Sequence, residues 1–138
     1  MTDTTTTPLS TYADAISQFT AVHPVPAGYA FRFDTPADPQ DETGIYLTTD
    51  NGQPCLQDDG ILWATLETCY DVPEFPDDHS AIKSMMDRNG IRFDRKSREF
   101  ILSLPSDPAS AALLGLTFQT VLRCISALAH TAGPATIC

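Results

Sequence analysis

The fold class is indicated by the stretch Ile45-Tyr46-Leu47-Thr48-Thr49-Asp50-Asn51-Gly52-Gln53-Pro54-Cys55-Leu56-Gln57. It begins as a strand at Ile45-Tyr46-Leu47. The Asp50-Asn51-Gly52 segment predicts a tight hairpin turn, because Asn and Gly accept the positive φ angles that such turns require. Residues 54–57 then return as a second short strand. A turn is preferred to a calcium loop, since no further ligands follow at the required spacing.

One more strand and a helix are predicted before this hairpin. Tyr29, Phe31 and Phe33 recur at every second position, which is the period of a strand with one buried face. The three strands are expected to form an antiparallel meander. Ser10 is predicted to cap an earlier helix that runs to about Val22 and ends at the run His23-Pro24-Val25-Pro26. The apolar stripe of that helix contains Tyr12, Ile16 and Phe19.

Two helices and a second hairpin are predicted after the meander. The first helix covers residues 61–70, with Asp58 or Asp59 as its N-cap. The second follows Asp77 or Asp78 and ends at Asn89-Gly90. Its apolar residues are Ile82, Met85 and Met86. The hairpin pairs residues 91–93 with residues 100–102 around a basic turn.

The last helix is predicted at residues 108–130, after the cap Asp107 and a proline at the first helical position. Its polar stripe contains Gln119, Thr120, Arg123 and Ser126. The wide apolar remainder contains Leu113, Phe118, Val121, Leu122, Ile125 and Leu128. Arg123 and the polar stripe argue against a transmembrane helix. We therefore expect a central core helix, or one that is shared across a dimer.

These elements predict one α+β domain with the order α-β-β-β-α-α-β-β-α, in which an antiparallel sheet (the three-stranded meander plus the second hairpin) packs against helices. The domain is expected at residues 10–131, between a disordered Thr-rich tail at 1–9 and a flexible tail at 132–138. Without an export signal the protein is expected in the cytoplasm with reduced cysteines. Cys55, Cys69 and Cys124 are predicted to be buried and Cys138 to be exposed. No metal site and no cofactor are predicted.

The charge of the chain is strongly negative and unevenly spread. Its 138 residues include 18 acidic and 8 basic residues, for a net charge of −10. Residues 1–82 contain fourteen acids and one base, whereas residues 83–98 contain six bases and two acids. A field of this sign repels phosphate backbones and speeds encounters with basic surfaces. We therefore predict a protein partner with a basic surface, with no direct nucleic-acid contact through the acidic face and no membrane.

The sequence contains few motifs that carry chemistry. It has no glycine-rich phosphate loop, nucleophile elbow or paired-His zinc motif. Asp58 and Asp59 are candidates for a metal-binding or acid–base pair. A helix cap with a solvated neighbour is preferred, because a perturbed carboxylate needs burial that the sequence does not show. The basic turn, defined by Arg92, Arg95, Lys96 and Arg98, is interpreted first as a solvated turn paired with the protein's own acids. The alternative is a docking site for an acidic partner or a nucleic-acid backbone.

Residues 45–129 resemble a family of small, functionally uncharacterised bacterial and phage proteins. The matching pieces are Tyr46-Leu47-Thr48-Thr49, Gln57-Asp58-Asp59-Gly60, Arg88-Asn89-Gly90-Ile91-Arg92-Phe93 and the helix at 113–129. This resemblance implies a prophage or mobile-element setting and no known enzymatic activity. The order of elements is also similar to that of the acidic dimeric chaperones of type III secretion, which have one helix between their hairpins where this chain has two.

We therefore expect a non-enzymatic phage or mobile-element accessory protein that inhibits a host nucleic-acid-handling defence complex, of the anti-CRISPR or anti-restriction type. Carboxylates on a rigid scaffold can occupy a groove built for phosphates. The predicted contacts with the host complex are Asp38, Asp41, Glu42, Asp58, Asp59, Asp71, Glu74, Asp77 and Asp78. Two alternatives stay open: a chaperone for an effector protein that dimerises through the C-terminal helix, and an enzyme that uses Asp58 or Asp59.

Overall fold

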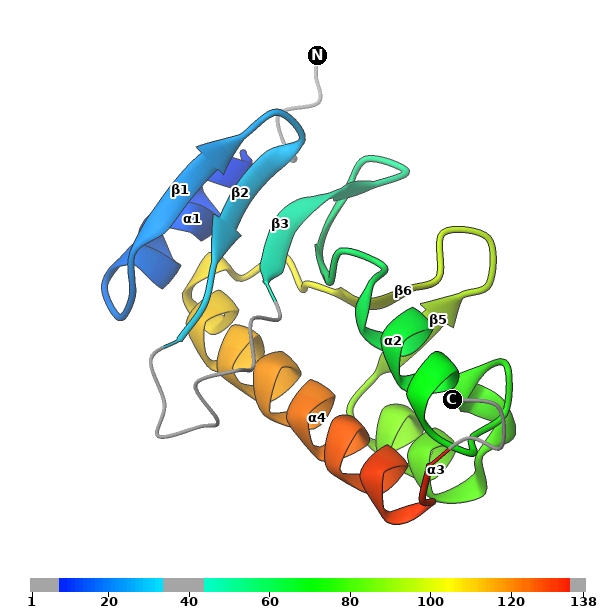
Figure 1. The fold of residues 1–138 in the computed structure, drawn as a ribbon. Coiled ribbons are helices and arrows are strands. Elements are labelled where there is room, and N and C mark those ends of the chain that lie inside the picture. Colours follow the sequence, from blue (N-terminus) through cyan, green and yellow to red (C-terminus); the bar gives the residue numbers. More distant parts are fainter. Residues whose placement is uncertain (1–7, 34–43, 135–138) are drawn as a thin grey trace.

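The computed structural model describes residues 8–33 and 44–134, which form an α+β fold (Figure 1). The elements are α1 (Leu9–Ser17), β1 (Val22–Val25), β2 (Gly28–Phe31), β3 (Ile45–Asp50), β4 (Gln53–Gln57), α2 (Leu62–Cys69), the 3-10 turn η1 (Pro76–Asp78), α3 (Ser80–Arg88), β5 (Ile91–Asp94), β6 (Glu99–Ser103), the 3-10 turn η2 (Pro108–Ser110) and α4 (Ala111–Thr131). The predicted fold class and order of elements are confirmed, and the structure adds the strand β1 ahead of the predicted meander.

All six strands join one antiparallel sheet in the order β1-β2-β3-β4-β6-β5. The predicted turn between β3 and β4 is confirmed, with φ of +54° at Asn51 and +80° at Gly52. The pairing of β4 with β6 joins the meander to the second hairpin. Leu47 lies opposite Leu56, which lies opposite Leu102. All three are buried, so this face of the sheet forms the core.

The region after α1 differs from the prediction, because α1 ends at Ser17 and residues 22–25 form a strand. Phe19, predicted on the buried stripe, is 72% exposed. β1 is an edge strand, where a proline such as Pro24 is tolerated because only one side needs a hydrogen-bonded neighbour. The β1–β2 turn approaches β3 closely. A Cβ at Gly28 would lie 2.0 Å from the carbonyl oxygen of Leu47, so only glycine fits there.

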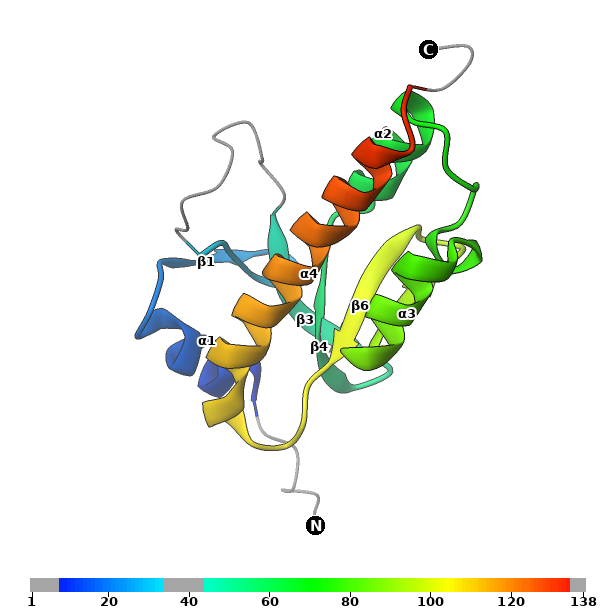
Figure 2. The same cartoon turned by 90° about the horizontal axis from the view of Figure 1, so that it is seen from below.

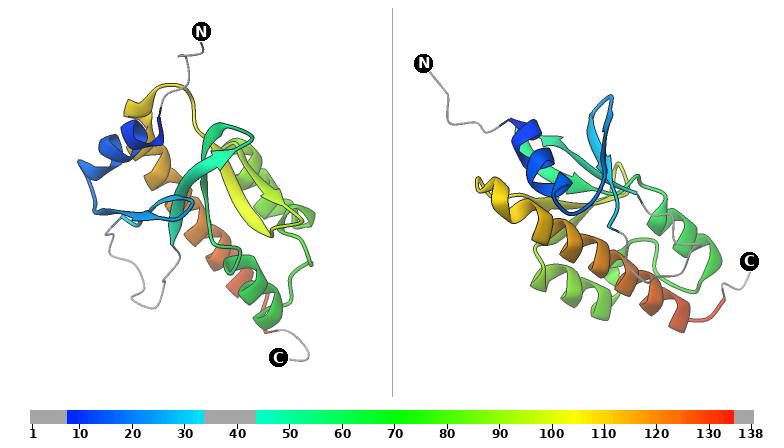
Figure 3. Two further views of the ribbon diagram at one scale, coloured as in Figure 1. Left: turned by 90° about the horizontal axis from the view of Figure 1, so that it is seen from above. Right: turned by 90° about the vertical axis from the view of Figure 1, so that its left-hand side faces the viewer.

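The helices pack mainly on one face of the sheet. From below, α4 and α3 lie in front of the strands (Figure 2), whereas from above the strands β1–β4 lie in front of α4 (Figure 3, left). α4 contacts α1, α2 and α3. The side chains between these layers form one apolar cluster. Its largest fully buried members are Trp63, Tyr12, Phe100 and Phe118.

Two residues of α4 lie on the opposite side from the one predicted. Leu113, predicted in the apolar remainder, is 69% exposed, and Gln119, predicted in the polar stripe, is buried. The Phe33 N–H donates to Gln119 Oε1 at 2.7 Å, and Gln119 Nε2 donates to the Phe33 carbonyl at 2.9 Å. Phe33 lies past the end of β2, and the Gln119 side chain makes the two backbone hydrogen bonds there that a neighbouring strand would otherwise make. Gly115 brings α4 to within van der Waals distance of the Phe31 and Phe33 rings.

Residues Pro108–Thr131 are long and apolar enough to span a membrane by length and composition, with a mean hydropathy of 1.5. Within this fold, one face of the helix is part of the core shared with the sheet and the other helices. A core helix of this length and composition meets the same criterion.

Several helix ends differ from the predictions. α1 begins at Leu9 after Pro8, without a side-chain cap from Ser10. α3 is capped by His79, whose Nδ1 accepts from the Ile82 N–H, whereas Asp77 and Asp78 lie in η1. Asp107, predicted to cap the last helix, accepts from the Ala109 N–H and caps η2, the 3-10 turn that leads into α4, whereas the N-cap of α4 itself is Ser110.

The predicted C-terminal tail is held where the structure describes it. The Asp71 N–H donates to the Gly133 carbonyl at 3.0 Å, and Tyr70 forms an isolated bridge with Pro134. Gly133 and Pro134 therefore contact the connection that follows α2, and the rest of the predicted tail, residues 135–138, lies outside the described residues.

Candidate functional site

Asp58 is buried, contrary to its prediction as a helix cap or a surface contact. Its side chain is fully buried, and its N–H donates to the Phe100 carbonyl at 3.3 Å. The Phe100 N–H donates in return to Asp58 Oδ1 at 2.7 Å. Asp58 thus extends the pairing of β4 with β6, and the N-cap position of α2 is taken by Ile61. A residue without exposed surface cannot contact a partner, so Asp58 leaves the predicted contact set.

The second carboxylate oxygen of Asp58 has no hydrogen-bond partner among the described residues. Burial raises the pKa of Asp58 to about 7. Hydrogen bonds from the Phe100 and Gly60 N–H groups act in the opposite direction, whereas the charges of Asp59 and Glu99 raise the pKa further. Asp58 therefore has the burial that a perturbed carboxylate needs, which could not be recognised from the sequence.

Asp59 and Glu99 line one cavity of about 290 Å³ on the strand face opposite the core. The β1–β2 turn forms one side through Ala27 and Gly28, and β3 contributes Tyr46 and Thr48. Asp59 is fixed at the rim, because its Oδ1 accepts from the Ile61 N–H at 3.1 Å. Asp59 was predicted as a partner contact, whereas Glu99 and the cavity were not predicted.

The basic turn is paired with the protein's own acids, as the preferred interpretation expected. Arg92 pairs with Asp50, and Arg98 pairs with Glu67 at 3.2 Å. Arg95 pairs with Asp77 at 3.2 Å and with Asp78 at 3.5 Å. The turn is closed by Asp94, whose carboxylate accepts from the Ser97 and Lys96 N–H groups, and these bonds lower the pKa of Asp94. Within the described chain, the Lys96 ammonium makes no ion pair.

Four predicted contact residues lie in residues 71–78, which we call the acidic connection. It contains Asp71, Glu74, Asp77 and Asp78. The backbone is held at Glu74, whose carbonyl accepts from Trp63 Nε1 at 2.9 Å and from Arg98 at 3.3 Å. The guanidinium of Arg95 lies 4.2 Å from the centre of the Phe75 ring. The connection is therefore fixed by an indole, two guanidinium groups and two prolines.

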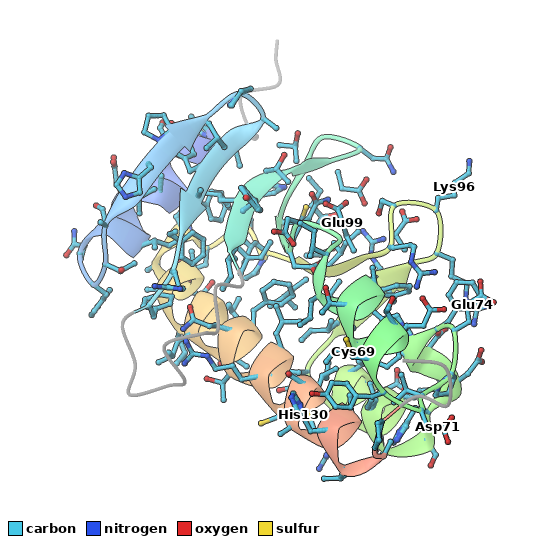
Figure 4. The ribbon with its side chains drawn as sticks, in the orientation of Figure 1. Cys69, Asp71, Glu74, Lys96, Glu99 and His130 are labelled. Carbon is cyan, nitrogen blue, oxygen red and sulfur yellow. The ribbon has the colours of Figure 1, made fainter. Side chains whose placement is uncertain are left out.

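The carboxylates of the acidic connection fall into two pairs. Asp77 and Asp78 are partly neutralised by Arg95. Asp71 and Glu74 are exposed, and neither carboxylate has a hydrogen-bond or ion-pair partner among the described residues. Figure 4 shows both side chains on the outer side of the molecule. Asp71 and Glu74 are thus the part of the predicted set that stays available for contact.

Replacing Arg95 by Gln is expected to lower the free energy of unfolding by about 1 kcal/mol, because the variant loses the ion pairs with η1 and the cation–π contact with Phe75. Urea denaturation in 0.05 M and 0.5 M NaCl measures this loss, and the ion-pair part should shrink in high salt. Lys96→Gln is the matched control, since it removes an adjacent charge that has no ion pair. Equal losses in the two variants would contradict the assignment.

The remaining predicted residues have no clear place in a site. Asp38, Asp41 and Glu42 lie outside the described residues. Among residues 8–33 and 44–134, no three His, Cys, Asp or Glu side chains are grouped so as to hold a metal ion. Cys55 is buried, which raises its pKa to about 11, and Cys69 is half-buried. Cys124 is exposed on α4, contrary to its prediction as a buried residue, and Cys138 lies outside the described residues.

Comparison with protein-family models, with curated proteins and with solved structures gives no match. The resemblance to the small bacterial and phage family and the similarity to secretion chaperones therefore stay predictions. The homodimer through the last helix also stays a prediction. The surface relevant to it carries Leu113 and Leu116 of α4, which are both exposed.

Proposed function

We propose that this chain is a non-enzymatic module that binds a basic protein surface through the acidic connection. The observation that carries the proposal concerns Asp71 and Glu74, two exposed carboxylates that have no partner within residues 8–33 and 44–134 and that lie on a backbone held from several sides. A segment that is already ordered loses little conformational entropy when a partner docks, so more of the contact energy is available for affinity. Opposite charge on the partner would also speed the encounter.

The ion pairs of the basic turn support a basic rather than an acidic partner. The basic turn should bind an external anion only weakly, because Arg92, Arg95 and Arg98 already form ion pairs with acids of the same molecule. The net charge of −10 then acts outward through the carboxylates that remain unpaired. A basic protein surface suits such a field, whereas a phosphate backbone would be repelled.

The finer form of the proposal concerns the kind of partner. A protein groove that holds nucleic acid is lined with lysine and arginine, and carboxylates on a rigid loop can take the place of phosphates there. We propose that the chain is a phage or mobile-element accessory protein that inhibits a host defence complex of this kind. Its support is the acidic connection together with the resemblance of residues 45–129 to small phage proteins.

The double variant Asp71→Asn/Glu74→Gln should weaken binding to a purified CRISPR effector or restriction complex by tenfold or more, since two interface charges are lost. Biolayer interferometry on a panel of such complexes, at two salt concentrations, measures this change. The control Asp14→Asn/Asp107→Asn removes the same net charge from an exposed position of α1 and from the exposed N-cap of η2, where Asn is also a favourable cap, and should change the Kd less than twofold. Equal weakening in both double variants would mean that only net charge matters. Absence of binding by the unmodified chain to every complex would refute the finer proposal.

A further inference from the structure

We propose that the cavity lined by Asp59 and Glu99 binds a primary ammonium group on an alkyl stem. A lysine side chain or a small aliphatic amine carries this chemistry. The site is separate from the acidic connection and does not depend on the function proposed for it. The argument rests on the cavity, on two carboxylates that reach it from different segments, and on the apolar surface beside them.

The two carboxylates are both free to accept from a cation. Glu99 is the first residue of β6 and is half-buried, yet its carboxylate has no hydrogen bond or ion pair within the described chain. The nearest lysine in sequence, Lys96, points away from Glu99 into solvent (Figure 4). Asp59 uses Oδ1 for the Ile61 N–H, which leaves Oδ2 available at the rim. Residues 8–33 and 44–134 therefore supply no ion-pair partner to these two carboxylates.

The rest of the lining suits a methylene stem. Val25 at the end of β1 and Ala27 of the β1–β2 turn line the cavity with small apolar residues, and Tyr46, whose aromatic ring can attract a cation, also lines it. The turn is held in place because the Thr48 hydroxyl donates to the Ala27 carbonyl at 2.9 Å. A volume of about 290 Å³ suits a single side chain better than a drug-sized ligand. A lining that contains both carboxylates and apolar residues matches an alkylammonium group.

Asp58 does not line the cavity, but it can report on charge that binds there. It lies between the lining residues Gln57 and Asp59, is fully buried, and has an unpartnered Oδ2. Within the described chain, the charged groups that act on it are Asp59 from the β4–α2 connection and Glu99 from β6. A bound cation would favour the ionised form of Asp58, so binding would release a proton. Affinity should therefore rise as the pH increases through about 7.

The test uses the full chain and n-butylammonium chloride, followed by amide chemical shifts in ¹H–¹⁵N spectra at pH 6 and pH 8 and constant ionic strength. We expect saturable shifts at Gly28, Thr48 and Asp59, with tighter binding at pH 8. Glu99→Gln should weaken binding about fivefold, as the loss of one partly exposed charge pair predicts. The control Glu74→Gln removes an exposed charge outside the cavity and should leave the Kd within twofold. Asp58→Asn should retain binding but lose its dependence on pH.

Two further probes separate this proposal from weaker explanations. Ammonium chloride tests the charge without a stem, and n-butanol tests the stem without a charge. Equal shifts with either probe, or an unchanged Kd in Glu99→Gln, would overturn the proposal. Nα-acetyl-lysine amide then distinguishes the sources, because tighter binding than butylammonium indicates a protein side chain, and equal binding indicates a free amine. The Asp71→Asn/Glu74→Gln variant should bind butylammonium normally, so failure at one site is distinguishable from failure at the other.

Discussion

Replacing Asp58 by Asn should raise the free energy of unfolding at pH 8 by about 2 kcal/mol. The folded-state pKa of about 7 lies above the ordinary value of 3.8, so the native protein holds a proton that the unfolded chain releases. The stability linked to this proton is fully present below pH 3.8 and is lost as the pH rises through 7. The gap corresponds to roughly 4 kcal/mol. Asn keeps the acceptor for the Phe100 N–H, but its buried amide N–H groups cost about 1–3 kcal/mol, which leaves the smaller net gain.

Urea denaturation between pH 4 and pH 8 checks this expectation. The unmodified protein should lose stability as the pH rises across this interval, and Asp58→Asn should lose less. Asp14→Asn is the control, because Asp14 is exposed on α1, and its curve should run parallel to that of the unmodified protein. If the Asp58→Asn curve also ran parallel to that of the unmodified protein, the assignment of a raised pKa to Asp58 would be wrong.

Replacing Gln119 by Leu should lower the free energy of unfolding by about 3 kcal/mol. The change keeps a side chain of similar size but removes both partners of the Phe33 backbone, whose N–H and carbonyl are buried against α4. Each buried backbone group left without a partner costs about 1–3 kcal/mol, and the added apolar burial offsets part of this. Phe33 should also become the site of faster amide hydrogen exchange.

The neighbouring residue provides the control for this change. Thr120 is exposed and its hydroxyl donates to Leu116 of the same helix. Thr120→Ala should therefore change the stability by less than 0.5 kcal/mol, which is typical of a surface substitution. An equally small effect of Gln119→Leu, or unchanged exchange at Phe33, would show that solvent replaces the lost side chain at little cost.

The strands and turns could be predicted from the sequence because their causes are local. Alternation at Tyr29, Phe31 and Phe33 reflects the two-residue period of a strand, and Asn51-Gly52 supplies the two positive φ angles of the hairpin. The pairing of β4 with β6 was not predictable in the same way. It joins segments more than forty residues apart, and no local pattern encodes which edge of the meander receives the second hairpin.

The main errors concern residues whose role depends on a distant neighbour. Because Gln119 is polar, a helical wheel places it on the solvent-exposed face of α4. It is buried because it hydrogen-bonds Phe33, which lies 86 residues away in the sequence. Pro24 was interpreted as a helix breaker, yet its place in an edge strand depends on pairing with β2. Asp58 was assigned to the helix that follows it, whereas its side chain binds β6.

The candidate site was predictable only in part. The sequence shows that acids are abundant before residue 83, and the nine predicted contacts include Asp71 and Glu74, which are exposed. It does not show which acids are neutralised, because the partners of Arg95 lie 17 and 18 residues away from it. Glu99 was missed because the predicted strand began at Phe100, whereas β6 begins at Glu99.

The clamp that Gln119 forms on Phe33 has a consequence for how the chain can change. On one side of residues 34–43, Phe33 is fastened to α4, and shortly after the other side Ile45 is paired with Phe31. Both ends of the intervening stretch are thus fixed by contacts that do not involve it. A substitution that removes the clamp would therefore free the end of β2 from α4, whereas the pairing of Ile45 with Phe31 would remain.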